Sequence, residues 1–418
     1  MAIFSFSSED GCILVNHERL YSPSRRLRIS PHKPLLPYGS HLYPIPQGMT
    51  SADMMLSEEE KTFSFTKLVF NHRNAPRVRD ESNQQDEDVQ MEVEILQMIG
   101  GNPGSGYSPG PQKVLCRVVV APSTSPQKQE HEMPVGGQLL FLKIFDALFW
   151  HKVIGITKRL LKVTVQADGA FSDEFGAYHF LYEHGRTGFS RTEFDRTGYS
   201  HAAPQFFGGW TAKVTSAHPT FANQSRQVAV LALEYVHGVC LESLFTSSGP
   251  IPDRFKLYRG TPAPARFSTD LDQRMQIVAQ LMDGTVAQEF LGLDHTELHP
   301  KNVIITMQNM GQPLEKPRAV LVGYGRALVD DVRTEPAGFW KHFPTKHHPI
   351  IRFGWHRLDP FGGWIPLEWR GPEDDIDDAP LLDKWMLETF GSLKGNPEYT
   401  TFVRETPPTG VVPEEQQP

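Results

Sequence analysis

The chain has 418 residues, of which 39% are hydrophobic and 22% charged, and its formal net charge at pH 7 is −8. This composition predicts a globular core and argues against nucleic acid as a partner, because an acidic surface repels phosphate. Cys12, Cys116 and Cys240 are odd in number and widely spaced, which excludes a disulfide framework and favours a reducing compartment. No apolar run approaches the roughly 20 residues of a membrane helix, and no signal pattern opens the chain. We therefore expect an intracellular protein, cytoplasmic or nuclear, without a membrane partner.

Residues 1–78 are expected to form an N-terminal extension that is partly irregular, because Ser-Pro and Pro turns interrupt it. A short helix is predicted over 51–60, with Ser51 as its cap. Alternating apolar residues over 62–70 then predict an edge strand.

Three arginines of this extension, Arg25, Arg26 and Arg28, form a basic patch that could dock a protein partner. The alternative is a solvated loop. Residues 79–91 are acidic and lack an apolar period, which predicts a disordered linker. The tail, residues 401–418, is rich in Pro, Glu and Gln and is also expected to be disordered.

Apolar runs with turn signals between them predict a set of strands after the linker. They are expected over 93–99, 113–121, 138–146, 204–214 and 227–236. The connection between the first two, residues 100–112, is rich in Gly and Pro. Lys143 interrupts the apolar run of the third strand, and a buried Lys needs an anionic partner. The alternative is an edge strand whose Lys side chain reaches solvent.

A helix is predicted over 171–182, with Ser172 as its cap. One face of this helix carries an acid followed by apolar residues. The face consists of Glu174, Ala177, Tyr178 and Leu181. Glu174 is therefore placed to meet Lys143, and the alternative is that it only complements the positive end of the helix dipole.

The strand over 227–236 runs into Glu-Tyr-Val-His-Gly, residues 234–238, and a helix is expected to begin at 240–245. A longer helix is predicted over 268–291, with apolar residues spaced by four, three and four and with Gly292 after its end.

Residues 295–302 read His-Thr-Glu-Leu-His-Pro-Lys-Asn and lead into the apolar run 303–305. This stretch resembles the catalytic loop of the protein kinase-like superfamily, whose pattern is His-x-Asp-x-x-x-x-Asn before a strand. The His-Pro pair and the later Gly-Trp-Ile-Pro, residues 363–366, resemble the fungal protein-kinase-like proteins, which are related to aminoglycoside phosphotransferases.

The resemblance covers roughly residues 92–395. It implies an α+β fold of the two-lobed protein-kinase-like kind, with a β-rich N-lobe over 92–236 and a helical C-lobe over 237–400.

Matching positions imply roles for several residues, with ATP as the cofactor. Lys143 would hold the nucleotide phosphates and pair with Glu174, and the main chain at Glu234 and Val236 would pair with adenine. Glu297 stands where the family has its catalytic Asp. Asn302 stands where the family has the catalytic-loop Asn that binds the metal. His295 is the structural His of the motif.

Gly323 is the main departure from the family pattern, because the family has the Asp of Asp-Phe-Gly there. That Asp holds Mg²⁺, and glycine offers no ligand atom, which puts Mg in doubt. The glycines of 100–112 also do not follow Gly-x-Gly-x-x-Gly. Neither Asp330 nor Asp331 is expected to replace the missing carboxylate, because a fold-back would be needed.

These departures favour a pseudokinase that acts as a nucleotide-binding or scaffolding module. The alternative is an active atypical kinase that transfers the γ-phosphate of ATP to a protein or small-molecule hydroxyl, with Glu297 as the base. A third possibility is a kinase-derived interaction module that no longer binds a nucleotide. Histidines at 342, 347 and 348 could suggest a metal site, but the lysines beside them repel a cation, so a solvated basic loop is expected.

Overall fold

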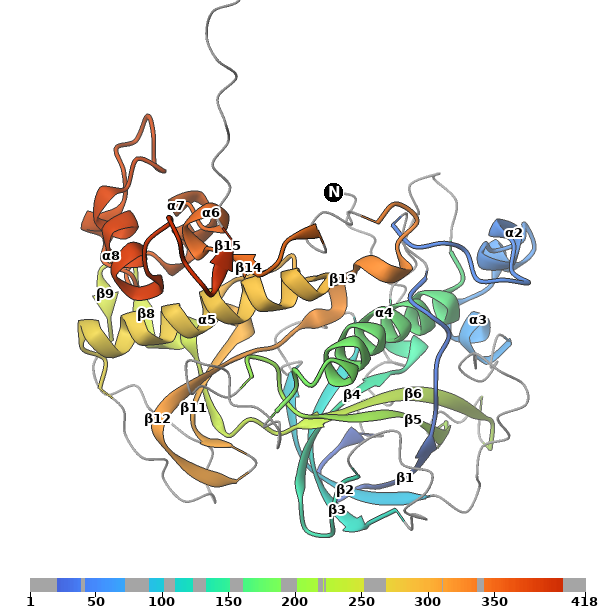
Figure 1. Ribbon diagram of the computed structural model, residues 1–418. Helices are drawn as coiled ribbons and strands as arrows, with labels where there is room; N and C mark the ends of the chain where they lie inside the picture. The colour runs from blue at the N-terminus through green and yellow to red at the C-terminus, as the bar shows by residue number, and fades with distance from the viewer. Residues whose placement is uncertain are drawn as a thin grey trace, which may run out of the picture.

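The computed structural model describes residues 21–38, 42–71, 90–100, 110–122, 133–150, 161–188, 201–216, 221, 223–251, 268–309, 311–336 and 342–400 (Figure 1). The expected C-terminal tail lies outside these residues, as do most of the acidic linker and most of the connection rich in Gly and Pro.

Six strands form a closed antiparallel barrel, in the spatial order β1-β2-β3-β4-β6-β5. Their bounds are β1 Arg26–Pro31, β2 Met91–Gly100, β3 Gln112–Val120, β4 Leu139–Phe145, β5 Phe206–Thr215 and β6 Ser225–Glu234. Apolar side chains from all six strands meet in one core cluster, in which Ile95, Val114 and Leu142 are each 0% exposed. Strands β2 to β6 fall close to the runs predicted from the apolar pattern.

The closed barrel contradicts the expected two-lobed fold with a helical second lobe. Closure depends on β1, which pairs with β2 (Leu27 opposite Val93) and also with β5 (Ile29 opposite Ala212). Residues 26–30 read Arg-Leu-Arg-Ile-Ser and alternate between polar and apolar, as a half-buried strand does, but the run is short and lies between Ser-Pro turns, and no strand was predicted there. A six-residue strand with two distant partners therefore changes the architecture.

Two arginines of the basic patch lie on β1 and not in a loop. Arg26 Nη1 and Arg28 Nε lie 3.0 Å and 3.4 Å from carboxylate oxygens of Glu92 on β2. The arginine side chains are 59% and 78% exposed, so these ion pairs add little stability.

Two short helices follow β1, and both differ from expectation. Helix α2, Ser51–Met54, is capped by Thr50 and not by Ser51. Helix α3, Phe65–Asn71, replaces the edge strand expected over 62–70. Ser64 accounts for the difference, because its side chain accepts a hydrogen bond from the N–H of Lys67 as a helix cap does.

Helix α4, Val163–Glu183, packs against β4, β5 and β6. It begins well before the predicted start, and the expected cap Ser172 is a buried residue inside it. The predicted face is confirmed: Glu174, Ala177, Tyr178 and Leu181 are all buried.

The rest of the chain mixes strands with helices. A second antiparallel sheet has the order β12-β11-β7, made of β7 Gly238–Cys240, β11 Val303–Asn309 and β12 Gln312–Leu321. Helix α5, Leu271–Leu291, begins three residues after the predicted start and is capped by Asp270, whereas its end before Gly292 is as predicted. The helix expected over 240–245 is instead a short 3₁₀ turn after β7.

Shorter elements complete the described chain. They are β8 Phe245–Thr246, β9 Gly249–Pro250, β10 Leu293–Asp294, β13 Leu328–Val329, β14 Lys346–His347, β15 Tyr399–Thr400, α6 Pro349–Arg352, α7 Trp355–Leu358 and α8 Pro380–Phe390. His347 and His348 are 2% and 0% exposed, so the solvated loop expected there is wrong. The buried ring of His348 still has a polar partner, because its Nε2 lies 3.0 Å from the carbonyl oxygen of Gly391.

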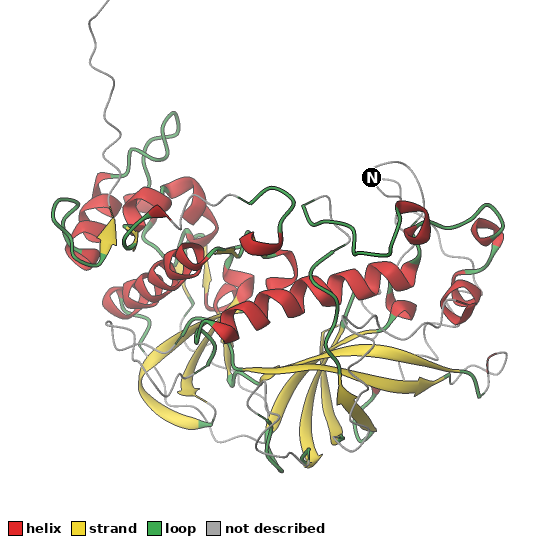
Figure 2. Cartoon of the chain, turned by 45° about the vertical axis from the view of Figure 1, so that its right-hand side comes forward, coloured by secondary structure: helices red, strands yellow, loops and turns green. Residues whose placement is uncertain are grey.

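Figure 2 shows the helices on one side of the molecule and the long strands on the other. Among the described residues, no helix combines the length and the apolar character that crossing a membrane requires.

Candidate functional site

A pocket of about 480 Å³ lies where barrel strands β2, β3, β4 and β6 meet the second sheet. It is lined by Gln97, Ile99, Lys113, Phe141, Lys143, Tyr178, Pro204, Leu233, Glu234, Tyr235, Val236, Gly238, Lys301, Asn302, Ile304, Val322 and Gly323. Four residues predicted as site residues from separate parts of the sequence therefore line the same pocket: Lys143, Glu234, Val236 and Asn302. Glu174 joins them through Lys143, whereas Glu297 is not among the lining residues.

The expected contact between Lys143 and Glu174 forms. Lys143 Nζ on β4 lies 2.5 Å from Glu174 Oε1 on α4. Their side chains are 10% and 2% exposed, so the charges are largely removed from water. The edge-strand alternative is wrong, because β4 lies between β3 and β6 in the barrel. The pair fixes the Lys143 ammonium group at the pocket wall.

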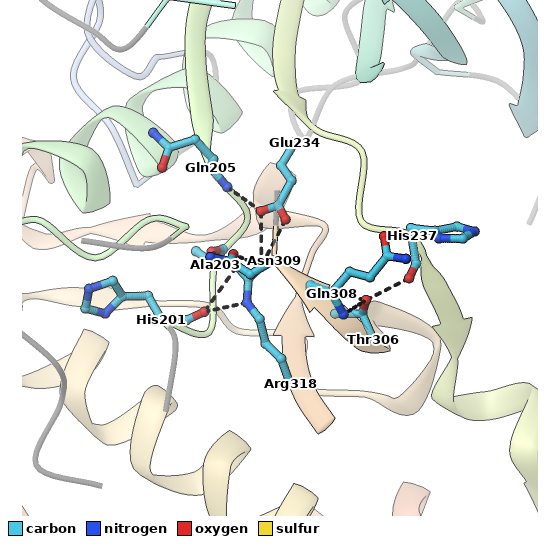
Figure 3. A network of polar contacts seen from close by, with 9 residues as sticks. All are labelled: His201, Ala203, Gln205, Glu234, His237, Thr306, Gln308, Asn309 and Arg318. Atoms are coloured by element: carbon cyan, nitrogen blue, oxygen red, sulfur yellow. Dashed lines mark hydrogen bonds and ion pairs between the residues drawn. The ribbon is translucent and has the colours of Figure 1, made fainter. Parts of the chain in front are cut away.

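The connection from β6 to β7 is held at both ends (Figure 3). The carboxylate of Glu234 lies 2.9 Å from Arg318 Nη1 and also accepts a hydrogen bond from the N–H of Gln205. Both charged side chains are less than 5% exposed. At the other end, the hydroxyl of Thr306 on β11 donates to the carbonyl of His237 at 2.7 Å.

Arg318 is a centre of this network. Its guanidinium group also donates to Asn309 Oδ1 at 2.8 Å and to the carbonyl of Ala203 at 3.1 Å, and it lies 3.4 Å from the carbonyl of His201 (Figure 3). One buried cation thus ties β6, β12 and the segment before β5 together.

The two residues expected to offer main-chain groups to adenine differ in availability. The N–H of Glu234 donates to the carbonyl of Gln205 at 2.8 Å, so it is occupied. In the described part of the chain, no hydrogen bond uses the N–H or C=O of Val236. Val236 therefore offers a main-chain donor and acceptor at the pocket wall.

The segment 295–302 is organised by hydrogen bonds to its own main chain and to the residues after β12. Asn302 Nδ2 donates to the carbonyl of Glu297 at 2.9 Å, and the carbonyl of Asn302 accepts from the N–H of Val322 at 2.8 Å. His295 Nε2 donates to the carbonyl of Val322 at 3.1 Å. These contacts place Asn302 beside Gly323.

His295 is buried, at 2% exposure, and its ring meets Tyr324 edge-on with centroids 4.5 Å apart. Burial lowers the pKa of His295 to about 4, so the ring is neutral at pH 7. The ring is thus held in the core by its contacts with Val322 and Tyr324.

Glu297 has a charged partner of its own. Its Oε1 lies 3.0 Å from Arg326 Nη1, and the hydroxyl of Thr296 donates to the carbonyl of Arg326 at 3.0 Å. Thr296 has a φ of 61°, an uncommon conformation for a β-branched residue. This strained turn directs the Glu297 carboxylate toward Arg326.

Gly323 adopts a left-handed conformation, with φ of 86° and ψ of 43°. A Cβ atom added there would lie 3.0 Å from Asn302 Oδ1, so even alanine would crowd the amide. Neither Asp330 nor Asp331 lines the pocket, and Asp330 lies 3.5 Å from Arg333 Nη1. Among the described residues, no group of three His, Cys, Asp or Glu side chains could hold a metal ion. Beside Asn302, Gly323 offers no side-chain ligand atom.

Three charged residues in or beside the pocket were given no role in the sequence analysis. Lys113 and Lys301 line the pocket, and Arg318 anchors Glu234. Lys113 gives no signal like that of Lys143, because it precedes an apolar run and does not interrupt one. Arg318 gives none, because its partner lies 84 residues away in the sequence.

No protein-family model matches this chain, and no curated protein matches it either. The function is therefore argued from the geometry of the pocket.

Proposed function

We propose that the pocket binds an adenine nucleotide and that the chain acts as a nucleotide-binding module without phosphoryl transfer. The observation that carries the proposal is the Lys143–Glu174 pair, which holds an ammonium group at the wall of a pocket of about 480 Å³. Pockets of this size suit small ligands, and such ligands need a few well-placed polar groups among apolar walls.

The adenine end of the pocket is assigned to the connection between β6 and β7. Leu233, Val236 and Ile304 offer apolar surface to a flat ring. Val236 also offers an N–H and a C=O, which can pair with the base edge. The ion pair of Glu234 with Arg318 holds this connection in place before a ligand arrives, which reduces the entropy lost on binding.

The phosphate end is assigned to Lys113, Lys143 and Lys301. All three line the pocket. An ammonium group binds phosphate as a point charge, and Glu174 orients one of the three. The positions of these residues in the pocket and their order in the sequence support a distant relationship between this site and the nucleotide site of kinase-like proteins.

Two features argue against phosphoryl transfer. Gly323 offers no carboxylate beside Asn302, and charge neutralisation by metal is a main part of kinase catalysis. The carboxylate of Glu297 is paired with Arg326 and is not among the residues that line the pocket, so it is not placed to accept a proton from a hydroxyl bound there.

Isothermal titration calorimetry of the full chain with ATP, ADP and adenosine tests the proposal. We expect ATP to bind, and a Lys143→Met variant to bind it at least about tenfold more weakly. The matched control is Lys213→Met on the outside of β5, which should bind as the wild type does. Absence of binding by all three ligands would contradict the proposal and leave a scaffold without nucleotide.

Incubation with γ-labelled ATP and Mg²⁺ or Mn²⁺ separates the module from an active kinase. We expect no transfer or hydrolysis above that of the Lys143→Met variant. Labelled phosphate on an added acceptor would instead support the active atypical kinase.

A further inference from the structure

The side chains of Lys113 and Lys143 face each other across neighbouring barrel strands. Lys113 on β3 is the direct partner of Lys143 on β4 in the antiparallel register. Such partners project from the same face with Cβ atoms about 4.5–5.5 Å apart, and like charges in this position destabilise a sheet. Both side chains line the pocket.

The carboxylates around this pair do not balance its charge. Glu174 is engaged by Lys143, and Glu234 is engaged by Arg318. In the parts of the chain that the structure describes, neither Lys113 nor Lys301 forms an ion pair. The pocket therefore carries more cationic groups than the described carboxylates around it neutralise, and an anionic ligand would complete the balance.

The pKa of Lys113 is shifted in these surroundings. Desolvation, followed by repulsion from the Lys143 charge, lowers its pKa, while Glu174 acts in the opposite direction. An anion between the two lysines would oppose this repulsion and raise the pKa of Lys113 toward its usual value.

The same pocket offers little to a divalent cation. Asn302 contributes one amide oxygen, and Gly323 contributes no side-chain ligand beside it. Mg²⁺ requires oxygen ligands in octahedral geometry and is usually held by carboxylates. A cation would also be repelled by Lys113, Lys143 and Lys301.

We propose that this pocket binds a nucleoside polyphosphate in its metal-free form, with Lys113 and Lys143 clamping the phosphates from adjacent strands in place of a metal ion. Lys301, in the turn that leads into β11, completes the cationic lining. This inference rests on the proposed function and assigns Lys113 a binding role that the motif-based reading did not include.

Titration calorimetry in EDTA and in excess Mg²⁺ tests the inference, with ATP and adenosine as the probes. We expect ATP to bind in EDTA at least as tightly as in Mg²⁺, and at least about tenfold more tightly than adenosine. Lys113→Gln should weaken ATP binding in EDTA about tenfold and leave adenosine unchanged. The matched control, Lys213→Gln on β5, should change neither.

Four outcomes overturn the inference. Binding of ATP in Mg²⁺ but not in EDTA would show that a metal is needed, and the proposed function would stand. Equal affinity for ATP and adenosine would show that the lysines do not bind the phosphates. Wild-type affinity in Lys113→Gln would remove Lys113 from the site. Absence of binding to either probe under both conditions would overturn the proposed function itself.

The salt dependence gives a second readout that does not need a variant. Binding that depends on exposed charges weakens as ionic strength rises. We expect the affinity for ATP to be lower at high salt than at low salt, and the affinity for adenosine to stay constant. An equal change in the two affinities would contradict binding of the phosphates by the lysines.

Discussion

Lys143 Nζ lies 2.5 Å from Glu174 Oε1, and this contact joins the barrel to helix α4 at the wall of the pocket. Both side chains are nearly buried. The pair therefore has two consequences that can be measured separately. It contributes to folding, because a buried charge needs its partner, and it sets the position of the ammonium group for a ligand.

Removal of one partner should destabilise the fold more than removal of both. Lys143→Met leaves the Glu174 carboxylate buried without a cation and should lower the free energy of unfolding by about 3–5 kcal/mol. The double variant Lys143→Met/Glu174→Met should recover most of this loss, because apolar side chains can replace a buried pair. Denaturation with guanidinium chloride measures both. A double variant less stable than the single one would contradict the account.

The Glu234–Arg318 pair should be as important for stability. Arg318→Met leaves Glu234 buried and uncompensated, at 5% exposure, and should cost about 3–5 kcal/mol of unfolding free energy. The control is Arg26→Met, whose ion pair with Glu92 is exposed, and its cost should be below about 1 kcal/mol. Urea denaturation of the two variants compares them, and equal losses would argue against the anchoring role of Arg318.

Gly323 should tolerate alanine poorly for two reasons. Its φ of 86° is unfavourable for an L-residue, at about 1–2 kcal/mol, and the new Cβ would lie 3.0 Å from Asn302 Oδ1. Gly137 is a matched control, because its φ is 81° and a Cβ atom added there would meet no described atom within 4 Å. The difference in unfolding free energy between Gly323→Ala and Gly137→Ala measures the contact with Asn302, and equal values would show that the amide moves freely.

His32 should make stability depend on pH on the acid side. The ring is 5% exposed and stacks on Phe171 at a centroid distance of 5.7 Å, and within the described chain neither of its nitrogens has a hydrogen-bond partner. Burial lowers the pKa of His32 to about 4 from 6.5. The folded-state pKa is depressed, so the unfolded chain binds the proton more readily, and the stabilisation present above pH 6.5 is lost as the pH falls toward 4.

The test compares stability against pH for the wild type and His32→Leu. Between pH 6.5 and 4 the wild-type curve should be steeper by up to about 1.4 kcal/mol per pH unit, because only the wild type takes up this proton on unfolding. Parallel curves would show that His32 is accessible to protons in the folded state.

Local sequence patterns predicted much of the described chain. The end of helix α5 was predicted because its signal, Gly292, directly follows the last helical residue. Strands β2, β3, β4 and β6 follow apolar runs. The Lys143–Glu174 contact was also predicted, because a lysine in an apolar strand and an acid on an apolar helix face each need a partner.

Long-range pairing was not predictable in the same way. Strand β1 closes the barrel through β2 and β5, and although its residues alternate between polar and apolar, nothing in them indicates these two distant partners. Arg318 pairs with Glu234 across 84 positions, and nothing near either residue indicates the other. The facing of Lys113 and Lys143 depends on strand register, which a shift of one residue would abolish.

Covalent labelling with an acyl-phosphate derivative of ATP tests the central claim most directly, because the reagent acylates lysines beside the bound phosphates. Mass spectrometry of the digested chain should find modification at one or more of Lys113, Lys143 and Lys301, and excess ATP should suppress it. Modification of Lys213 should be unaffected by ATP. Absence of ATP-suppressed modification at all three pocket lysines would contradict the assignment of this pocket as a nucleotide site.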